Sequence, residues 1–535
     1  MKKAFLNVLL ALIIGISANN CANRGNPEGG PKDETPPAVI KTEPENYGTG
    51  FNSREIKIYF DEYIKLNNLQ KQLVISPPMK TQPEITPLGT ASKEITIKIF
   101  DTLQPNTTYA FNFGNSIVDN NEGNPFPFYR YVFSTGTYID SLTVRGQIVD
   151  ALSRKPESFV SVMLYEADST FNDSIVYKQP PRYLTNTLDS LTTFTLENLK
   201  AGTYFLMALK DENNDNKFQQ KTDQIAFHKQ FITVPTDSSY TLKLFYEEID
   251  FEAARPRLLS GEKIAFGFEG DYKDMAIEIN SEVPDDFTSR VTKDPKADTL
   301  NYWYRPRLDA DTLLFTVTNP PKFKKDFTVR ISEQKRDTLA IKGTSGGLKL
   351  NEPFILTGST PFDSLDVSKV RIMDKDSTNI TFTTALDTLE NNLNFYFDKT
   401  EGNGYFIDVL PEAITDFFGD KNDSLSFRVS TRNASDLGSI RFNLVNPNFP
   451  IIIELTDKSG VVKASQYEAS KNRVDFLNLA PGMYSIRVIE DKNGNEKYDT
   501  GNYLKKIAPE RVIHFQDIEV RSDWGQITTL NFNAP

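Results

Sequence analysis

Short runs in which apolar and polar residues alternate, separated by clusters of Gly, Pro, Asn and Asp, make up most of this 535-residue chain. Glu55–Phe60 (EIKIYF), Glu94–Ile99 (EITIKI) and Thr203–Leu209 (TYFLMAL) are examples, and they suit β-strands. The spacing of apolar residues that marks an amphipathic helix is not sustained beyond the N-terminal segment. Because many short strands with turn residues between them form sandwiches, the pattern predicts an all-β chain of tandem β-sandwich domains.

The N-terminus has the features of a secretion signal. Lys2 and Lys3 precede an apolar run, Ala4–Ile16, which is shorter than the roughly 20 residues that a membrane-spanning helix needs. Cys21 is the only cysteine, and it stands where a lipoprotein signal peptidase would leave it as the first residue of the mature chain. We therefore expect a signal peptide over residues 1–20 and lipidation of Cys21, although Asn20 departs from the small residue usual before such a cysteine.

The segment after Cys21 predicts how the protein is held. Residues 22–37 read ANRGNPEGGPKDETPP, a composition that builds no core and is typical of a flexible tether. Acyl chains on Cys21 would then attach the folded mass to the outer membrane. The net charge of -12 argues against nucleic acid as a partner, since that binding depends on Lys and Arg.

Two internal repeats indicate duplicated modules. Leu199–Phe218 aligns without a gap onto Leu479–Tyr498, and both segments contain a G-x-Y motif. A weaker repeat pairs Ser116–Thr135 with Ala413–Thr431, which share the spacing of Ile, Asp, Gly and Ser-Thr. The first repeat predicts two copies of one module, and the second predicts the closing strand of two Ig-like sandwiches.

These residues carry resemblances to known families. Pro36–Gly136, with IKIYFDEYIKL at Ile56–Leu66, resembles the bacterial Ig-like domain of S-layer proteins, and the leader with GGPKDETPP resembles Ig-like-domain lipoproteins of Bacteroidota. The two G-x-Y modules resemble transthyretin-like or carboxypeptidase-regulatory-like sandwiches. These resemblances imply binding and folding roles rather than a reaction. Such lipoproteins occur in glycan-capture systems and as accessory subunits of outer-membrane assembly or secretion machines.

The domain plan predicted from these features has seven parts. They are a signal peptide (1–20), a tether (21–35), a bacterial Ig-like domain (36–136), a transthyretin-like sandwich (137–248), a β domain of undefined type (249–346), a divergent Ig-like domain (347–433) and a second transthyretin-like sandwich (434–535).

Catalytic motifs of common design are missing from the sequence. His228 and His514 are the only histidines, and neither G-x-S-x-G nor H-E-x-x-H occurs. Paired carboxylates could still act in a glycosidase, but short sandwiches in series rarely form the cleft that such a pair requires. We therefore predict that the protein is not an enzyme.

Two Asp-Asn loops are the strongest chemical signal, and calcium is the one cofactor that the sequence suggests. Alternating oxygen ligands suit calcium, but Thr222 and Asn502 occupy the position where an EF-hand loop has Glu. The alternative is a hairpin turn in which Asx side chains bond their own backbone. The candidate ligands are Asp211, Asn213, Asp215, Lys217 and Asp223 in the first loop, and Asp491, Asn493, Asn495, Lys497 and Asp499 in the second.

Aromatic residues supply a further hypothesis. Tyr302, Trp303 and Tyr304 form the densest group, which could stack on sugar rings, although alternation along a strand places part of the trio in the core. Trp524 is predicted to pack within a terminal strand.

Two functions remain open from the sequence. The favoured one is a non-catalytic, lipid-anchored scaffold of the outer membrane, on its cell-surface side, that is an accessory subunit of an assembly or secretion machine. The alternative is a surface glycan-binding protein of a nutrient-uptake system.

Overall fold

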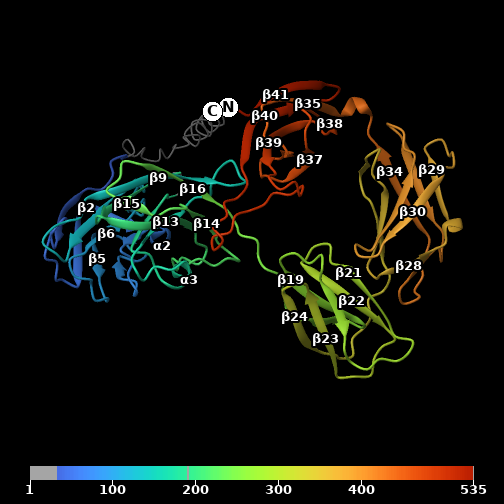
Figure 1. The fold of residues 1–535 in the computed structure, drawn as a ribbon, viewed down its shortest axis with the longest axis horizontal. Helices are drawn as coiled ribbons and strands as arrows, with labels where there is room; N and C mark the ends of the chain where they lie inside the picture. The colour runs from blue at the N-terminus through green and yellow to red at the C-terminus, as the bar shows by residue number, and fades with distance from the viewer. Residues whose placement is uncertain (1–32, 189–191, 534–535) are drawn as a thin grey trace, which may run out of the picture.

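The computed structural model describes residues 33–188 and 192–533 and is built almost entirely of strands, which confirms the all-β prediction. The sheets fall into five groups along the chain, which we call units 1 to 5, over residues 39–134, 142–244, 252–330, 341–431 and 438–531 (Figure 1). The described helices are short: α2 (Leu69–Gln72), α3 (Ile175–Lys178), η1 (Val367–Lys369) and η2 (Ala434–Asp436). No helix within these described ranges combines the length and apolar character needed to cross a membrane.

Unit 1 contains two facing sheets around an aromatic and Ile-rich core. The predicted run EIKIYF lies in β2 (Glu55–Leu66), and EITIKI lies in its partner β5 (Ser92–Lys98) except for Ile99. Ile56, Ile58, Ile95 and Ile97 are buried. The strands of the first sheet are β1 (Val39–Glu43), β2 (Glu55–Leu66), β5 (Ser92–Lys98), β4 (Glu84–Thr86) and β7 (Ile117–Asp119), and those of the second are β3 (Val74–Ser76), β6 (Thr108–Asn112) and β8 (Arg130–Ser134).

Unit 2 holds the first G-x-Y motif. One sheet contains β11 (Tyr183–Asn186), β10 (Ser161–Glu166), β13 (Gly202–Lys210), β14 (Gln224–Phe227) and β15 (Ile232–Val234), and the other contains β12 (Thr193–Leu199), β9 (Leu142–Asp150) and β16 (Ser239–Leu244). The Tyr204 hydroxyl donates to the Lys200 carbonyl at 3.0 Å, which closes the turn before β13. A Cβ atom on Gly202 would lie 3.2 Å from this hydroxyl, so glycine lets the ring pack against the turn.

Unit 5 repeats this strand order. Its first sheet contains β37 (Val462–Glu468), β36 (Ile451–Thr456), β39 (Gly482–Glu490) and β40 (Val512–Val520), and its second contains β38 (Arg473–Leu479), β35 (Gly438–Val445) and β41 (Gly525–Asn531). The Tyr484 hydroxyl donates to the Ala480 carbonyl at 2.8 Å, as Tyr204 does in unit 2. The sequence repeat thus corresponds to a repeated strand order and a repeated turn.

Units 3 and 4 are also pairs of facing sheets. Unit 3 contains β17 (Glu252–Ala253), β18 (Arg257–Ser260), β19 (Lys263–Glu269), β22 (Thr299–Arg305) and β21 (Thr288–Lys293), which face β20 (Ala276–Ile279), β23 (Thr312–Asn319) and β24 (Phe323–Arg330). Unit 4 contains β25 (Ile341–Gly343), β27 (Phe354–Gly358), β31 (Asn392–Phe397) and β30 (Phe382–Asp387), which face β26 (Gly347–Leu348), β34 (Leu425–Thr431), β32 (Gly404–Val409) and β29 (Val370–Asp374), with a small sheet of β28 (Phe362–Leu365) and β33 (Ile414–Asp416).

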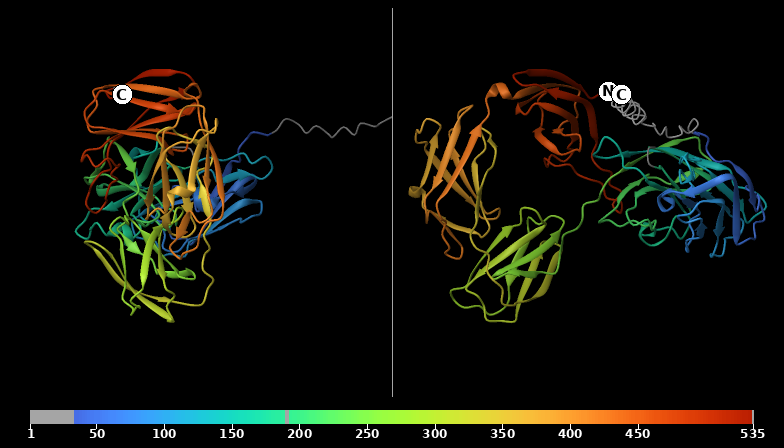
Figure 2. Two further views of the ribbon diagram at one scale, coloured as in Figure 1. Left: turned by 90° about the vertical axis from the view of Figure 1, so that its right-hand side faces the viewer. Right: turned by 180° about the vertical axis from the view of Figure 1, so that it is seen from behind.

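The units follow one another around a ring. Unit 1 packs beside unit 2, and the chain then passes through units 3 and 4 before unit 5 returns to unit 2 (Figures 1 and 2). A long loop from unit 5, drawn in red, reaches the β14 side of unit 2. Contacts between residues that are far apart in the sequence therefore close the ring.

Candidate functional site

The first Asp-Asn loop, between β13 and β14, is held by its own backbone. Asp211 accepts from the backbone N–H groups of Asn213, Asn214 and Asn216 at 3.1, 2.7 and 2.7 Å. Asp215 accepts from the Lys217 N–H at 3.0 Å. Burial raises the pKa of Asp211, although the bond from the Asn216 N–H partly offsets that rise. This is the geometry of the Asx-turn alternative.

The second Asp-Asn loop has the same form. Asp491 is fully buried and accepts from the N–H groups of Gly494 and Glu496 at 2.8 Å each. Asn495 donates its side-chain amide to Asp499 at 3.1 Å. Across residues 33–188 and 192–533 there is no group of three or more Asp, Glu, His or Cys side chains arranged to hold a metal ion. Calcium binding by either loop stays a prediction.

The aromatic trio lies inside the molecule rather than on its surface. Tyr302, Trp303 and Tyr304 are 3%, 3% and 1% exposed. The two tyrosines face the core of unit 3, and Phe418 of unit 4 packs on Trp303 with ring centroids 6.2 Å apart. No open ring face remains for a sugar, so the trio is no stacking platform.

Trp524 corrects another prediction. It is 62% exposed and lies in the turn before β41 instead of packing within the strand. The backbone carbonyl of Trp524 accepts a hydrogen bond from the Ser439 N–H at 3.0 Å. Trp524 therefore contacts β35 through its main chain rather than by packing its indole ring.

The two histidines lie in separate units and form no joint site. His228 Nδ1 lies 2.8 Å from the Gln230 carbonyl oxygen, and its ring contacts Tyr240 in unit 2. His514 lies on β40 of unit 5. Cys21, the predicted lipidation site, and residues 1–32 lie outside the described residues.

The loop from unit 5 inserts a tyrosine into unit 2. Tyr503, in the connection between β39 and β40, is fully buried in the cluster that covers the outer face of the β10–β13 sheet. Its ring centroid lies 5.8 Å from that of Phe205 and 5.5 Å from that of Phe227. We call residues 499–508 the clasp.

Polar contacts surround the inserted ring. The Tyr503 hydroxyl donates to the Asp173 carbonyl at 3.1 Å, and its backbone N–H donates to the Glu247 carboxylate. Lys506 pairs with the Asp173 carboxylate at 2.7 Å and lies over the Tyr503 ring, 3.8 Å from its centroid. Burial raises the pKa of Glu247, which the Tyr503 N–H partly offsets. The clasp is therefore anchored by both apolar and charged groups.

A second contact between units 2 and 5 lies at His514. Arg154 of unit 2 pairs with Asp517 at 2.9 Å and donates to the Phe515 carbonyl. Burial lowers the pKa of His514, and the positive charges of Arg154 and Arg487 lower it further. The neutral form of this histidine is thus favoured at the interface.

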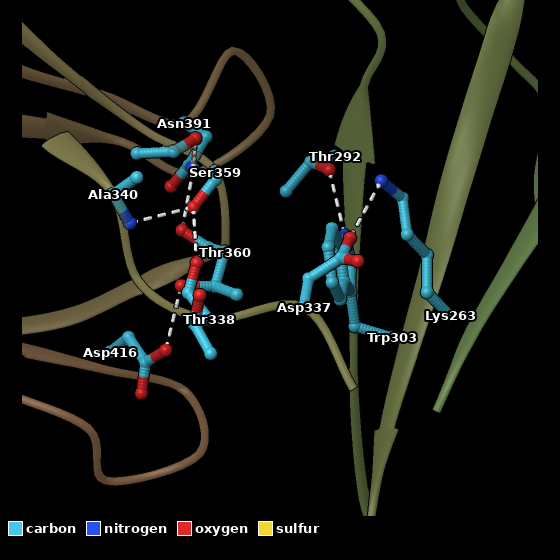
Figure 3. Close-up of polar contacts among 11 residues, drawn as sticks. Lys263, Thr292, Trp303, Asp337, Thr338, Ala340, Ser359, Thr360, Asn391 and Asp416 are labelled. Atoms are coloured by element: carbon cyan, nitrogen blue, oxygen red, sulfur yellow. Dashed lines mark hydrogen bonds and ion pairs between the residues drawn. The ribbon is translucent and has the colours of Figure 1, made fainter. Parts of the chain in front are cut away.

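The connection between units 3 and 4 is fixed on both sides (Figure 3). Asp337 pairs with Lys263 of unit 3 at 3.3 Å, and Lys263 lies 4.7 Å from the centroid of the Trp303 ring. Ser359 of unit 4 accepts from the Ala340 N–H and donates to the Thr338 carbonyl, both at 2.7 Å. The linker is therefore held to unit 3 at Asp337 and to unit 4 at Ser359, and Arg290 of unit 3 also pairs directly with Asp363 of unit 4 at 3.0 Å.

The sequence analysis missed the clasp, although two signals pointed to it. Phe205 and Met207 make β13 apolar on both faces, whereas the aligned Ser485 and Arg487 make β39 polar on one. A strand that is apolar on both faces needs a cover on each. The loop after β39 is also longer than the loop after β13. The extra length in one module covers the extra apolar face in the other.

Comparisons with known proteins identify one unit. Residues 33–135 match the family model described as a bacterial Ig-like domain, which confirms the resemblance of unit 1. No curated protein matches the chain.

Several solved structures are weakly similar in fold. They include surface layer protein SbsC, domains 1–6 (12% identity, TM-score 0.14, covering 86% of this chain and 66% of that chain), the Bacillus cereus major pilin subunit BcpA (11%, 0.14, 73% and 99%) and the Bacillus anthracis TIE protein (12%, 0.15, 94% and 75%). This chain spans just under two thirds of the SbsC structure.

Proposed function

We propose that this protein is a non-catalytic scaffold, anchored to the outer membrane by acyl chains on Cys21, and that it serves as an accessory subunit of an outer-membrane assembly or secretion machine. The observation that supports this proposal most is the closed ring. Five β-sandwich units are held in one arrangement by the clasp and by the linker contacts at Asp337 and Ser359. A frame of this kind presents separate surfaces at defined positions, which suits the recruitment of partners.

The organisation of the polar groups favours binding over catalysis. The most buried carboxylates of the Ig-like and G-x-Y loops, such as Asp119 and Asp491, accept bonds from backbone N–H groups of their own loops. Burial opposes the charge on Asp119, but these N–H groups prevail and hold its pKa below the ordinary value. Such carboxylates stabilise turns and are poorly placed to exchange protons with a substrate.

Fractionation of the full-length protein tests the anchor. Cys21→Ala should move the protein from the membrane fraction to a soluble or unprocessed form, because acyl chains are the one apolar anchor suggested by the sequence. Mature-length Cys21→Ala protein that still partitions with membranes would contradict the lipid anchor.

Purification in mild detergent tests the partner class. We expect the protein to co-purify with an outer-membrane protein in a defined ratio. Binding to soluble polysaccharide without a protein partner would instead support the glycan-binding alternative. Protease treatment of intact cells would then report whether the ring lies on the cell surface, as we propose.

A further inference from the structure

Equivalent faces of the two G-x-Y units differ in what covers them. In unit 2 the face at β11 and β12 lies against unit 1, where β3 runs beside β11 and the Leu184 N–H donates to Ser76 Oγ at 3.1 Å. Arg130 of unit 1 pairs with Glu197 and donates to Asn198 at 2.6 Å. Unit 1 thus covers this face of unit 2, and the contacts at Glu197 and Asn198 are charged and polar.

The same positions in unit 5 are apolar. The repeat alignment places Leu477 at Glu197, Ala480 at Lys200 and Met483 at Thr203. The turn before the G-x-Y motif is alike in both copies at one position, since Asn198 and Asn478 share the left-handed conformation with φ of 59° and 57°. Leu477 is 66% exposed and Met483 is 48% exposed. Unit 5 therefore presents exposed apolar side chains where unit 2 holds its neighbour by charge.

Unit 4 does not cover this face as unit 1 covers unit 2. A cavity of about 800 Å³ lies between the start of unit 4 and strands β37 and β38, and its apolar lining includes Leu348, Leu350, Leu437, Phe476, Leu477 and Met483. Among the described residues, no strand of unit 4 runs along β37 or β38 as β3 runs along β11. Both β37 and β38 are edge strands, each hydrogen-bonded to a sheet neighbour on one side. We call this space the edge groove.

The charges around the edge groove balance one another. Lys349 pairs with Glu352 at 2.6 Å, and Lys463 pairs with Asp457 at 2.9 Å. The remaining charged groups of the lining, Glu401 and Arg432, have opposite signs. In a chain with a net charge of -12, this local balance suits an uncharged, apolar occupant.

We propose that the edge groove binds an extended segment of a partner protein, in the position that unit 1 occupies on unit 2. The segment lies along the β37 and β38 edges and turns alternate apolar side chains toward Leu477 and Met483. Strand edges recognise extended peptides in this way, with the main chain supplying affinity and side-chain pockets supplying specificity. This inference rests on the proposed scaffold function and assigns it a partner surface.

Selection from a random peptide library displayed on phage tests the groove with the full chain as bait. The matched baits are the wild type, the double variant Leu477→Glu with Met483→Glu, and the control Ile527→Glu. Ile527 is also 66% exposed on the same unit, but it lies on β41 outside the groove. All three positions are exposed, so the melting temperature of each variant should match that of the wild type.

We expect the wild type and the Ile527→Glu control to recover peptides in which apolar residues alternate, and the double variant to bind those peptides at least tenfold more weakly. Peptides that bind all three baits equally, or the absence of wild-type-specific peptides, would overturn the proposal. A wild-type dimer that the double variant abolishes would overturn it in favour of a second copy as occupant. If the Glu variants fold poorly, Leu477→Ser with Met483→Ser gives the same comparison. None of these outcomes depends on the Cys21→Ala fractionation or the detergent purification. Failure of the edge-groove proposal can therefore be told apart from failure of the proposed scaffold function.

Discussion

Replacing Tyr503 with Ala should weaken the docking of the clasp on unit 2 without unfolding either unit. The aromatic side chain of Tyr503 is fully buried against unit 2, whereas the clasp itself is an extension of unit 5. Truncating a large buried aromatic side chain to Ala typically costs about 3 to 5 kcal/mol. Because unit 2 keeps its own inter-sheet core of residues such as Val162 and Leu206, this cost acts on the docking of the clasp.

The lost docking free energy predicts how much more often the clasp leaves unit 2. Each 1.4 kcal/mol changes an equilibrium constant about tenfold, so about 3 kcal/mol raises the undocked population by about two orders of magnitude. Hydrogen exchange followed by mass spectrometry should therefore speed up by a similar factor in peptides that cover the clasp. The Tyr503 N–H should respond most directly, because its acceptor, Glu247, lies outside unit 5, in the segment that follows β16 of unit 2.

The neighbouring residue provides the control. Leu504 is 57% exposed, so Leu504→Ala should leave exchange in the clasp unchanged. Clasp peptides that exchange at the wild-type rate in Tyr503→Ala would refute the argument that this side chain docks the clasp on unit 2.

Three further outcomes are expected. Gly501→Ala should weaken clasp docking, as measured by the same exchange experiment, because a Cβ atom there would lie 2.6 Å from the Phe245 ring. Since burial holds the pKa of His514 below its usual 6.5, the unfolded state takes up the proton first, and stability should fall as the pH drops below about 6.5; His514→Gln should flatten this decline in melting curves. If the first Asp-Asn loop binds calcium, calcium should raise the melting temperature of the full chain, and Asp211→Ala with Asp215→Ala should remove that increase; identical curves in chelator and calcium would end the metal hypothesis.

Local patterns in the sequence predicted the strands well, because a period of two reports directly on which side chains face a core. The run at Thr203–Leu209 forms most of β13, and the repeat at Leu479–Tyr498 contains β39, the equivalent strand of a second module with the same strand order. Residues 254–262 (ARPRLLSGE) lack a clear alternation of apolar and polar residues, and they contain β18, a short edge strand whose side chains are exposed or half-buried. A strand without a buried face leaves little periodic signal.

The sequence indicates that β13 needs a cover on each face, but it does not identify the residue of another unit that provides the cover. Trp303 is buried because Phe418 of unit 4 covers it, and Tyr503 because unit 2 surrounds it. Both covers come from distant parts of the chain, so neither leaves a pattern near the residue. Trp524 shows the converse, since an apolar residue beside a strand can still lie in an exposed turn. Where another unit covers a side chain, its burial can be predicted only when the arrangement of the units is known.

The distance along the chain between Tyr503 and Asp173, which is 330 residues, imposes an order on biogenesis. When synthesis proceeds from the N-terminus, unit 2 folds while the residue that covers Phe205 and Phe227 has yet to be made. Until unit 5 arrives, unit 2 carries a patch of unprotected aromatic surface of the kind that chaperones recognise. The clasp can therefore dock only after unit 5 has been made, and a chain truncated before unit 5 would remain prone to aggregation and degradation.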